Sequence, residues 1–145
     1  MSLFTETSKS SEKIISNIKK GDFTDIFENF IKIEHNHITI HYIYFKHFAS
    51  NSTYDFLTSL ITNKIDPIIN QYNNFIVHFN VKTFSLIEMD KHKSYIYSIS
   101  NHFKEKYPNK LEKCYIYNSS FLLNQLYNLV SSFVDKETIK KIEFI

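Results

Sequence analysis

Segments with the character of β-strands alternate along this chain with segments of helical periodicity, and this alternation constrains the fold most. Stretches rich in β-branched and aromatic residues predict four strands, at 38–48, 75–81, 114–117 and 142–145. The segments between them are long enough to form crossover helices. Strands that alternate with such helices pair mainly in parallel, with right-handed connections. The sequence therefore predicts an α/β fold with a mainly parallel four-stranded sheet, preceded by short N-terminal helices.

The run from Phe75 to Val81 is short and almost continuously apolar. Such a run suits a strand that is covered on both faces better than a solvated edge strand. We therefore expect residues 75–81 to form a central strand of the sheet.

Apolar residues at helical spacing predict the helices. The first is short and ends near Gly21, and the second carries Phe23, Ile26, Phe27, Phe30 and Ile31. In the third, Phe56, Leu57, Leu60 and Ile61 share one face, and Asp66-Pro67 is expected to interrupt the helix because the residue before proline avoids the α region. The remaining helical segments are a long helix that ends at Tyr107-Pro108, a helix over 122–133 and one turn through Ile139.

The length of 145 residues fits a single domain. Residues 1–12 are rich in Ser, Thr and Lys, so we expect a loose N-terminal segment and one domain over residues 13–145. No segment is apolar enough to span a membrane, and residues 1–13 lack the apolar core of a signal peptide. Cys114 is the only cysteine, so no intramolecular disulfide can form. These features predict a cytoplasmic protein without a transmembrane segment.

The charged residues argue against nucleic-acid binding. The 17 basic residues are almost balanced by 15 acidic ones, for a net charge of +2, and they are scattered along the chain. All of them are lysine, whereas arginine is the residue preferred for bidentate contacts with phosphate and guanine. Abundant Ile, Asn, Lys, Phe and Tyr are typical of an AT-rich genome, such as that of a large DNA virus.

The sequence offers no catalytic motif. Gly21 is the only glycine, which excludes both the G-x-S-x-G turn of a serine nucleophile and a glycine loop that cradles phosphate. Cys114 lies in a predicted strand, where a buried inert thiol is expected. We therefore predict a protein that is not an enzyme and needs no cofactor.

Histidines cluster near the first predicted strand, at positions 35, 37, 41 and 47. His37 and His41 would share a face of that strand, and histidine is a common ligand of zinc and copper. However, no cysteine or set of carboxylates lies near them in the sequence to complete a ligand set, so no metal site is predicted. His78 and His102 are single residues in apolar elements and are attributed to packing.

The stretch Tyr107 to Asn118, which reads YPNKLEKCYIYN, is similar to the CRAL-TRIO signature, in which YPERL and a strand that ends in INAP follow a long helix. The similarity continues through 121–142, which resembles the family segment F…LVKPFLDPVTVSKI, and 75–90 resembles the strand written VVIVDLKGLS. The resemblance covers about residues 75–145. It implies a CRAL-TRIO-like domain that binds a lipid or another small hydrophobic molecule.

In members of this family that bind phosphoinositides, a Glu after YP and a Lys at the end of TVSK form the headgroup signature. The matching positions here are Asn109 and Lys141. Lys141 keeps the positive charge that can meet a phosphate, whereas Asn109 lacks the carboxylate. The resemblance thus assigns these two residues to ligand binding. A lysine at the end of a helix is also favoured by the helix dipole alone.

In the family, the strand matched by 142–145 is followed by a gate helix that covers an apolar sheet face, and this sequence ends at Ile145. A ligand, the N-terminal helices or a second copy of the chain would then have to cover that face, so a homodimer is expected. Two functions remain open at this point. One is lipid binding, with peripheral contact to a membrane. The other is a non-catalytic protein–protein interaction or structural module that has lost lipid binding.

Overall fold

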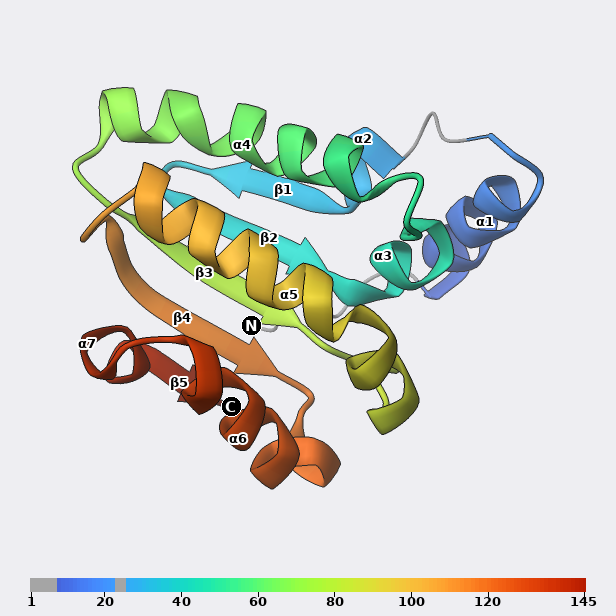
Figure 1. Ribbon diagram of the computed structural model, residues 1–145. Helices are drawn as coiled ribbons and strands as arrows, with labels where there is room; N and C mark the ends of the chain where they lie inside the picture. Colours follow the sequence, from blue (N-terminus) through green and yellow to red (C-terminus); the bar gives the residue numbers. More distant parts are fainter. Residues whose placement is uncertain (1–7, 23–25) are drawn as a thin grey trace.

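The computed structural model describes residues 8–22 and 26–145. Its strands form one five-stranded sheet in the order β1-β2-β3-β4-β5 (Figure 1). The strands are β1 (Ile31–Glu34), β2 (His37–His41), β3 (Phe75–Asn80), β4 (Leu111–Tyr117) and β5 (Ile142–Phe144). The helices are α1 (Ser8–Lys19), α2 (Ile26–Asn29), α3 (Tyr42–Phe48), α4 (Tyr54–Gln71), α5 (Leu86–Lys106), the 3-10 turn η1 (Ser120–Leu122), α6 (Leu123–Phe133) and α7 (Lys136–Ile139).

The sheet confirms the predicted α/β class with mainly parallel pairing. Strands β2 to β5 pair in parallel, and only β1 runs antiparallel to its neighbour β2. Each parallel strand lies beside the previous one, so all the crossovers advance across the sheet in one direction. Right-handed crossovers that advance in one direction place their helices on the same face. Accordingly, α4, α5 and α6 all lie in front of the sheet in Figure 1.

The crossover helices of the described part of the chain cover only one face of β3. Val77 and Phe79 pack against the core beneath the helices. His78 and Asn80 alternate with them and point to the opposite face, where no helix within 8–22 or 26–145 adds a crossover. Its position as the central strand of the sheet is confirmed.

Strand β1 replaces part of the helix predicted to carry Ile26, Phe30 and Ile31. Helix α2 ends at Asn29, and Ile31 and Ile33 then alternate in β1, opposite Ile40 and Ile38 of β2. The turn between the strands is possible because His35 adopts a left-handed backbone with φ 56°. Pairing with β2 thus overrides the helical spacing of the apolar residues. Phe23 of the predicted helix lies outside the described residues.

The strand predicted over 38–48 is also shorter than expected. It ends at His41, and Tyr42–Phe48 forms helix α3. Tyr42 and Phe45, three residues apart, are both buried and their ring centroids lie 5.6 Å apart. Burial of this helical face beyond the end of the sheet outweighs the β propensity of the tyrosines.

Pro67 does not interrupt the third helix. Helix α4 continues through Pro67 to Gln71, with Ile65 and Ile68 buried on either side of the proline. A proline inside a helix removes one backbone hydrogen bond, and the packing of these neighbours holds the helix together across the gap.

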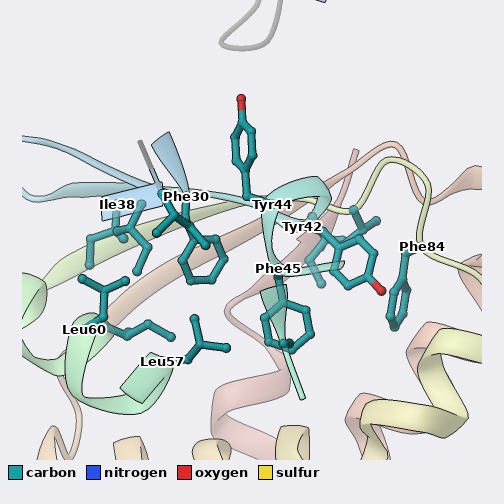
Figure 2. Close-up of a cluster of buried hydrophobic side chains, with 14 of the residues drawn as sticks. Phe30, Ile38, Tyr42, Tyr44, Phe45, Leu57, Leu60 and Phe84 are labelled. Atoms are coloured by element: carbon teal, nitrogen blue, oxygen red, sulfur yellow. The ribbon is translucent and has the colours of Figure 1, made fainter. Parts of the chain in front are cut away.

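The core lies between the sheet and the helices in front of it. Figure 2 shows part of this core, where buried side chains from β2, α3, α4, the residue before β1 and the loop before α5 lie together: Phe30, Ile38, Tyr42, Phe45, Leu57, Leu60 and Phe84. Leu57 and Ile38 are fully buried. Helix α1 packs on α3, and through Ile14 and Ile18 it joins the same core. Residues 8–12, assigned to a loose segment by the sequence, are helical in the structure.

Candidate ligand-binding face

The two faces of the sheet differ in chemistry because the strand registers align side chains of the same kind. On the face toward the helices, Ile40, Phe79, Ile116 and Phe144 lie side by side across β2 to β5. On the opposite face, Thr39, His78, Tyr115 and Glu143 lie side by side. We call this second surface the polar face. Its other members on β2, β3 and β4 are His37, His41, Ile76, Asn80, Lys113 and Tyr117.

His78 lies at the centre of the polar face and joins three strands. Its Nε2 lies 2.8 Å from Nδ1 of His37 on β2, and its Nδ1 lies 2.8 Å from the hydroxyl of Tyr117 on β4. The ring also stacks on His37 and Tyr115, with centroid distances of 5.1 Å and 5.4 Å. His78 is only 8% exposed, although no crossover helix covers it.

The protonation of this cluster follows from its hydrogen bonds. Burial lowers the pKa of His78, and charge repulsion from His37 lowers it further, so the neutral ring is favoured. Burial also raises the pKa of Tyr117, so the phenol keeps its proton. A neutral His78 satisfies both neighbours when Tyr117 donates to Nδ1 and Nε2–H donates to His37.

Charged side chains surround the cluster. Lys113 lies beside Ile76, and Ile76 lies beside His37. This row therefore contains a cation, an apolar side chain and a polar ring. Glu143 lies beside Tyr115 at the edge. The polar face therefore offers aromatic ring faces at its centre and both signs of charge at its rim. This combination can hold a molecule with an apolar body and a polar end.

The two residues assigned by the family resemblance lie elsewhere, where β4 and β5 begin. Asn109 is exposed in the turn before β4, with φ 60°. Lys141 is half-buried in the turn before β5, and its carbonyl accepts a hydrogen bond from the Cys114 N–H at 2.8 Å. Both therefore lie at the same end of the sheet, and their role in ligand binding stays a prediction.

The sequence did not reveal the central role of His78. It grouped His37 with His35, His41 and His47, whereas the structure pairs His37 with His78, and His47 lies in helix α3. Alternation along 75–80 would have placed His78 and Asn80 on one face, but only the parallel strand order brings His37 and Tyr117 next to them. In the described residues, no three His, Cys, Asp or Glu side chains lie close enough to hold a metal ion.

A second polar group lies inside the core and joins α4 to α5. His92 is 1% exposed, and its Nδ1 lies 2.7 Å from the hydroxyl of Tyr54. Tyr54 also stacks on Tyr95, and the hydroxyls of Tyr95 and Thr58 form a hydrogen bond. Burial raises the pKa of Tyr95 to about 12. These contacts between helices are best explained by packing, although Nε2 of His92 has no partner among the described residues.

Comparison with known families identifies the fold. The family described as CRAL/TRIO domain matches residues 30–145, most of the chain. The chain belongs to the CRAL/TRIO domain family. Comparison with curated proteins found no match. The family match begins at Phe30, so it extends the resemblance seen in the sequence to β1 and β2 of this CRAL/TRIO domain. Members of the family bind lipids or other small hydrophobic molecules.

No helix in the described part of this CRAL/TRIO domain is both long and apolar enough to cross a membrane.

Proposed function

We propose that this CRAL/TRIO domain binds a lipid or a similar amphipathic molecule on the polar face of its sheet. The observation that carries the proposal is the ring cluster of His37, His78, Tyr115 and Tyr117 on the face opposite the crossover helices. The faces of the tyrosine rings supply apolar contact area for the body of the ligand. His37, which is exposed, and Lys113 supply hydrogen-bond donors for its polar end.

The chemistry of the buried side chains supports binding rather than catalysis. Burial raises the pKa of Cys114 to about 12, so its thiol stays protonated and is a poor nucleophile. Both ring nitrogens of His78 are already engaged by His37 and Tyr117, so the ring has no free nitrogen with which to activate a substrate. We propose that the domain is not an enzyme.

Native mass spectrometry of the protein purified from a eukaryotic host tests the lipid proposal. We expect a stoichiometric lipid on the native chain and its loss in a Tyr115→Lys variant. Tyr97→Lys is the matched control, because Tyr97 is a 54% exposed tyrosine on helix α5, on the other side of the sheet. Repeated absence of lipid from the native chain, or equal loss from both variants, would contradict the proposal.

The headgroup role of Lys141 and Asn109 is tested separately with vesicles that contain phosphoinositide. Lys141→Ala should weaken vesicle binding if Lys141 contacts the phosphate. Lys140→Ala is the control, because the neighbouring Lys140 is exposed and pairs with Glu137 at 3.3 Å. Equal effects of the two variants would mean that only the overall charge matters.

A protein–protein interaction module is the second candidate function. It is favoured by a groove that lies away from the polar face, between the β1–β2 hairpin and helix α4.

A further inference from the structure

A groove of about 410 Å³ runs between the β1–β2 hairpin and the C-terminal half of helix α4. This volume falls in the usual range of ligand sites. Ile33 and His35 form one wall, and Lys64, Pro67 and Tyr72 belong to the opposite side. The groove lies at the β1 edge of the sheet, so it is separate from the His78 cluster at the centre.

Two backbone sites at the groove lie outside the regular hydrogen-bond pattern of the hairpin and of the helix. The N–H of His41 donates to the carbonyl of Phe30, so alternation along the hairpin turns the N–H and C=O of Ile33 away from β2. Ile33 is 38% exposed, and β1 is an edge strand. Pro67 has no N–H, so the carbonyl of Asn63, four residues earlier, lacks its helical donor. Asn63 also lines the groove.

The charge of the groove has one sign. Among the described residues that line it, Lys64 is positively charged and none is acidic. Asp66, on the same helix, is engaged elsewhere, because it accepts a hydrogen bond from Tyr107 at 2.6 Å and pairs with Lys106 at 3.5 Å. Glu34 alternates with Ile33 and therefore points to the opposite face of the sheet.

The hairpin wall is held in place from outside the groove. Nδ2 of Asn36 donates to the carbonyl of Asn74 at 3.3 Å and to its side-chain oxygen at 3.2 Å. The carbonyl of Asn36 accepts from the N–H of Ile76 at 2.9 Å. The tip of the hairpin is thus tied to the loop that follows α4, which keeps both walls of the groove at a fixed separation.

We propose that this groove binds an extended, acidic peptide segment of another protein. The segment adds to the edge of β1 at Ile33, which is how sheet edges recognise extended chains. One of its N–H groups donates to the carbonyl of Asn63, and its carboxylate meets Lys64 and His35. Aliphatic side chains of the segment pack on Ile33 and Tyr72.

The probe for the test is an acetylated hexapeptide of alternating threonine and valine that ends in glutamate with a free C-terminal carboxylate. Its neutral counterpart ends in glutamine amide. In titrations followed by amide NMR, we expect the acidic peptide to shift the signals of Ile33, Lys64 and Tyr72. The neutral peptide should bind with an affinity at least about tenfold lower.

Three variants separate the contributions of charge and backbone. Lys64→Glu should weaken binding of the acidic peptide about tenfold or more, because it replaces a charge-assisted hydrogen bond by repulsion. Pro67→Ala restores the helical N–H that engages the carbonyl of Asn63, so it should weaken binding while the helix is retained. Lys82→Glu makes the same charge change on an exposed lysine after β3 and should leave binding unchanged.

Several outcomes would overturn the proposal. They are signal shifts confined to other parts of the chain, equal binding of the acidic and neutral peptides, and an unchanged affinity in Lys64→Glu. A dimer that Ile33→Asp dissociates, in the absence of any peptide response, would assign the groove to self-association instead. The peptide test is independent of the lipid proposal, because the two sites are separate. Tyr115→Lys alters the polar face and leaves the groove intact.

Discussion

Nδ1 of His37 and Nε2 of His78 lie 2.8 Å apart on neighbouring parallel strands, although 41 residues separate them in the sequence. The rings are nearly parallel, at 16°, so the pair combines a hydrogen bond with stacking. Because only one proton can lie between the two nitrogens, the contact requires that one ring donates and the other accepts.

This pair should show a measurable coupling energy. In a double-mutant cycle with His37→Ala and His78→Ala, we expect the two free energies of unfolding to differ from additivity by about 0.5–1.5 kcal/mol, the usual net value of a neutral hydrogen bond. Urea denaturation at pH 7.5 measures all four proteins. Strict additivity would mean that the two rings do not interact in solution.

Acid should destabilise the domain before its carboxylates titrate. Burial and then the charge of Lys32 lower the pKa of His41 to about 4, below its ordinary 6.5, so the unfolded chain binds this proton more readily than the folded chain. The contribution of neutral His41 to the free energy of unfolding is complete above pH 6.5 and is lost as the pH falls toward 4. For His41 alone the loss at pH 5 is about 2 kcal/mol. Urea denaturation at pH 7.5 and pH 5 measures it.

Burial also lowers the pKa of His78 and His92, so their effects have the same sign. The control is His41→Gln, which should show a smaller loss between the two pH values than the native chain. The same pH dependence in both proteins would remove His41 as a cause.

Leu57 and its neighbour Phe56 should differ sharply in their contributions to stability. Leu57 is fully buried between α4 and the sheet, and Leu57→Ala should cost about 2–5 kcal/mol. Phe56, which the sequence placed on the same inward face, is 41% exposed. Phe56→Ala should therefore cost clearly less. Thermal and urea unfolding of the two variants provide the comparison, and equal losses would contradict the packing of α4.

Cys114 should react slowly with thiol reagents in the folded protein. Cys114 is partly buried, and the raised pKa keeps the reactive thiolate scarce. At pH 8 we expect the reaction with a disulfide reagent to be many times slower in buffer than in concentrated urea. A fast reaction in buffer would contradict the raised pKa of the thiol.

The homodimer expected from the sequence stays a prediction, and the structure indicates where to test it. Strand β5 is the other edge of the sheet, and Ile145, which follows it, is 59% exposed. If a dimer forms through this edge, Ile145→Lys should dissociate it in light scattering at micromolar concentration. A native chain that is monomeric at that concentration would contradict the expectation.

The alternation of strands and crossover helices from β2 to β5, and much of the core, could be predicted from the sequence. Periodicity along the chain is a local property, so the strand at 75–80 and the buried positions Leu57, Leu60 and Ile61 follow from the spacing of apolar residues. The signature from Tyr107 to Asn118 also indicated the family correctly, and the family match extends over residues 30–145.

Only the tertiary structure decided where elements end and what the two faces of the sheet carry. Apolar spacing in 26–31 fits a helix, but pairing with β2 makes Ile31 the start of a strand. Burial of Tyr42 and Phe45 turns the end of the predicted first strand into a helix. The polar face arises because every crossover advances in one direction, which leaves His78 on the face that no crossover helix of the described residues covers and brings His37 and Tyr117 to it. Contacts between residues about 40 positions apart depend on strand order and register, and no local pattern in the sequence specifies either.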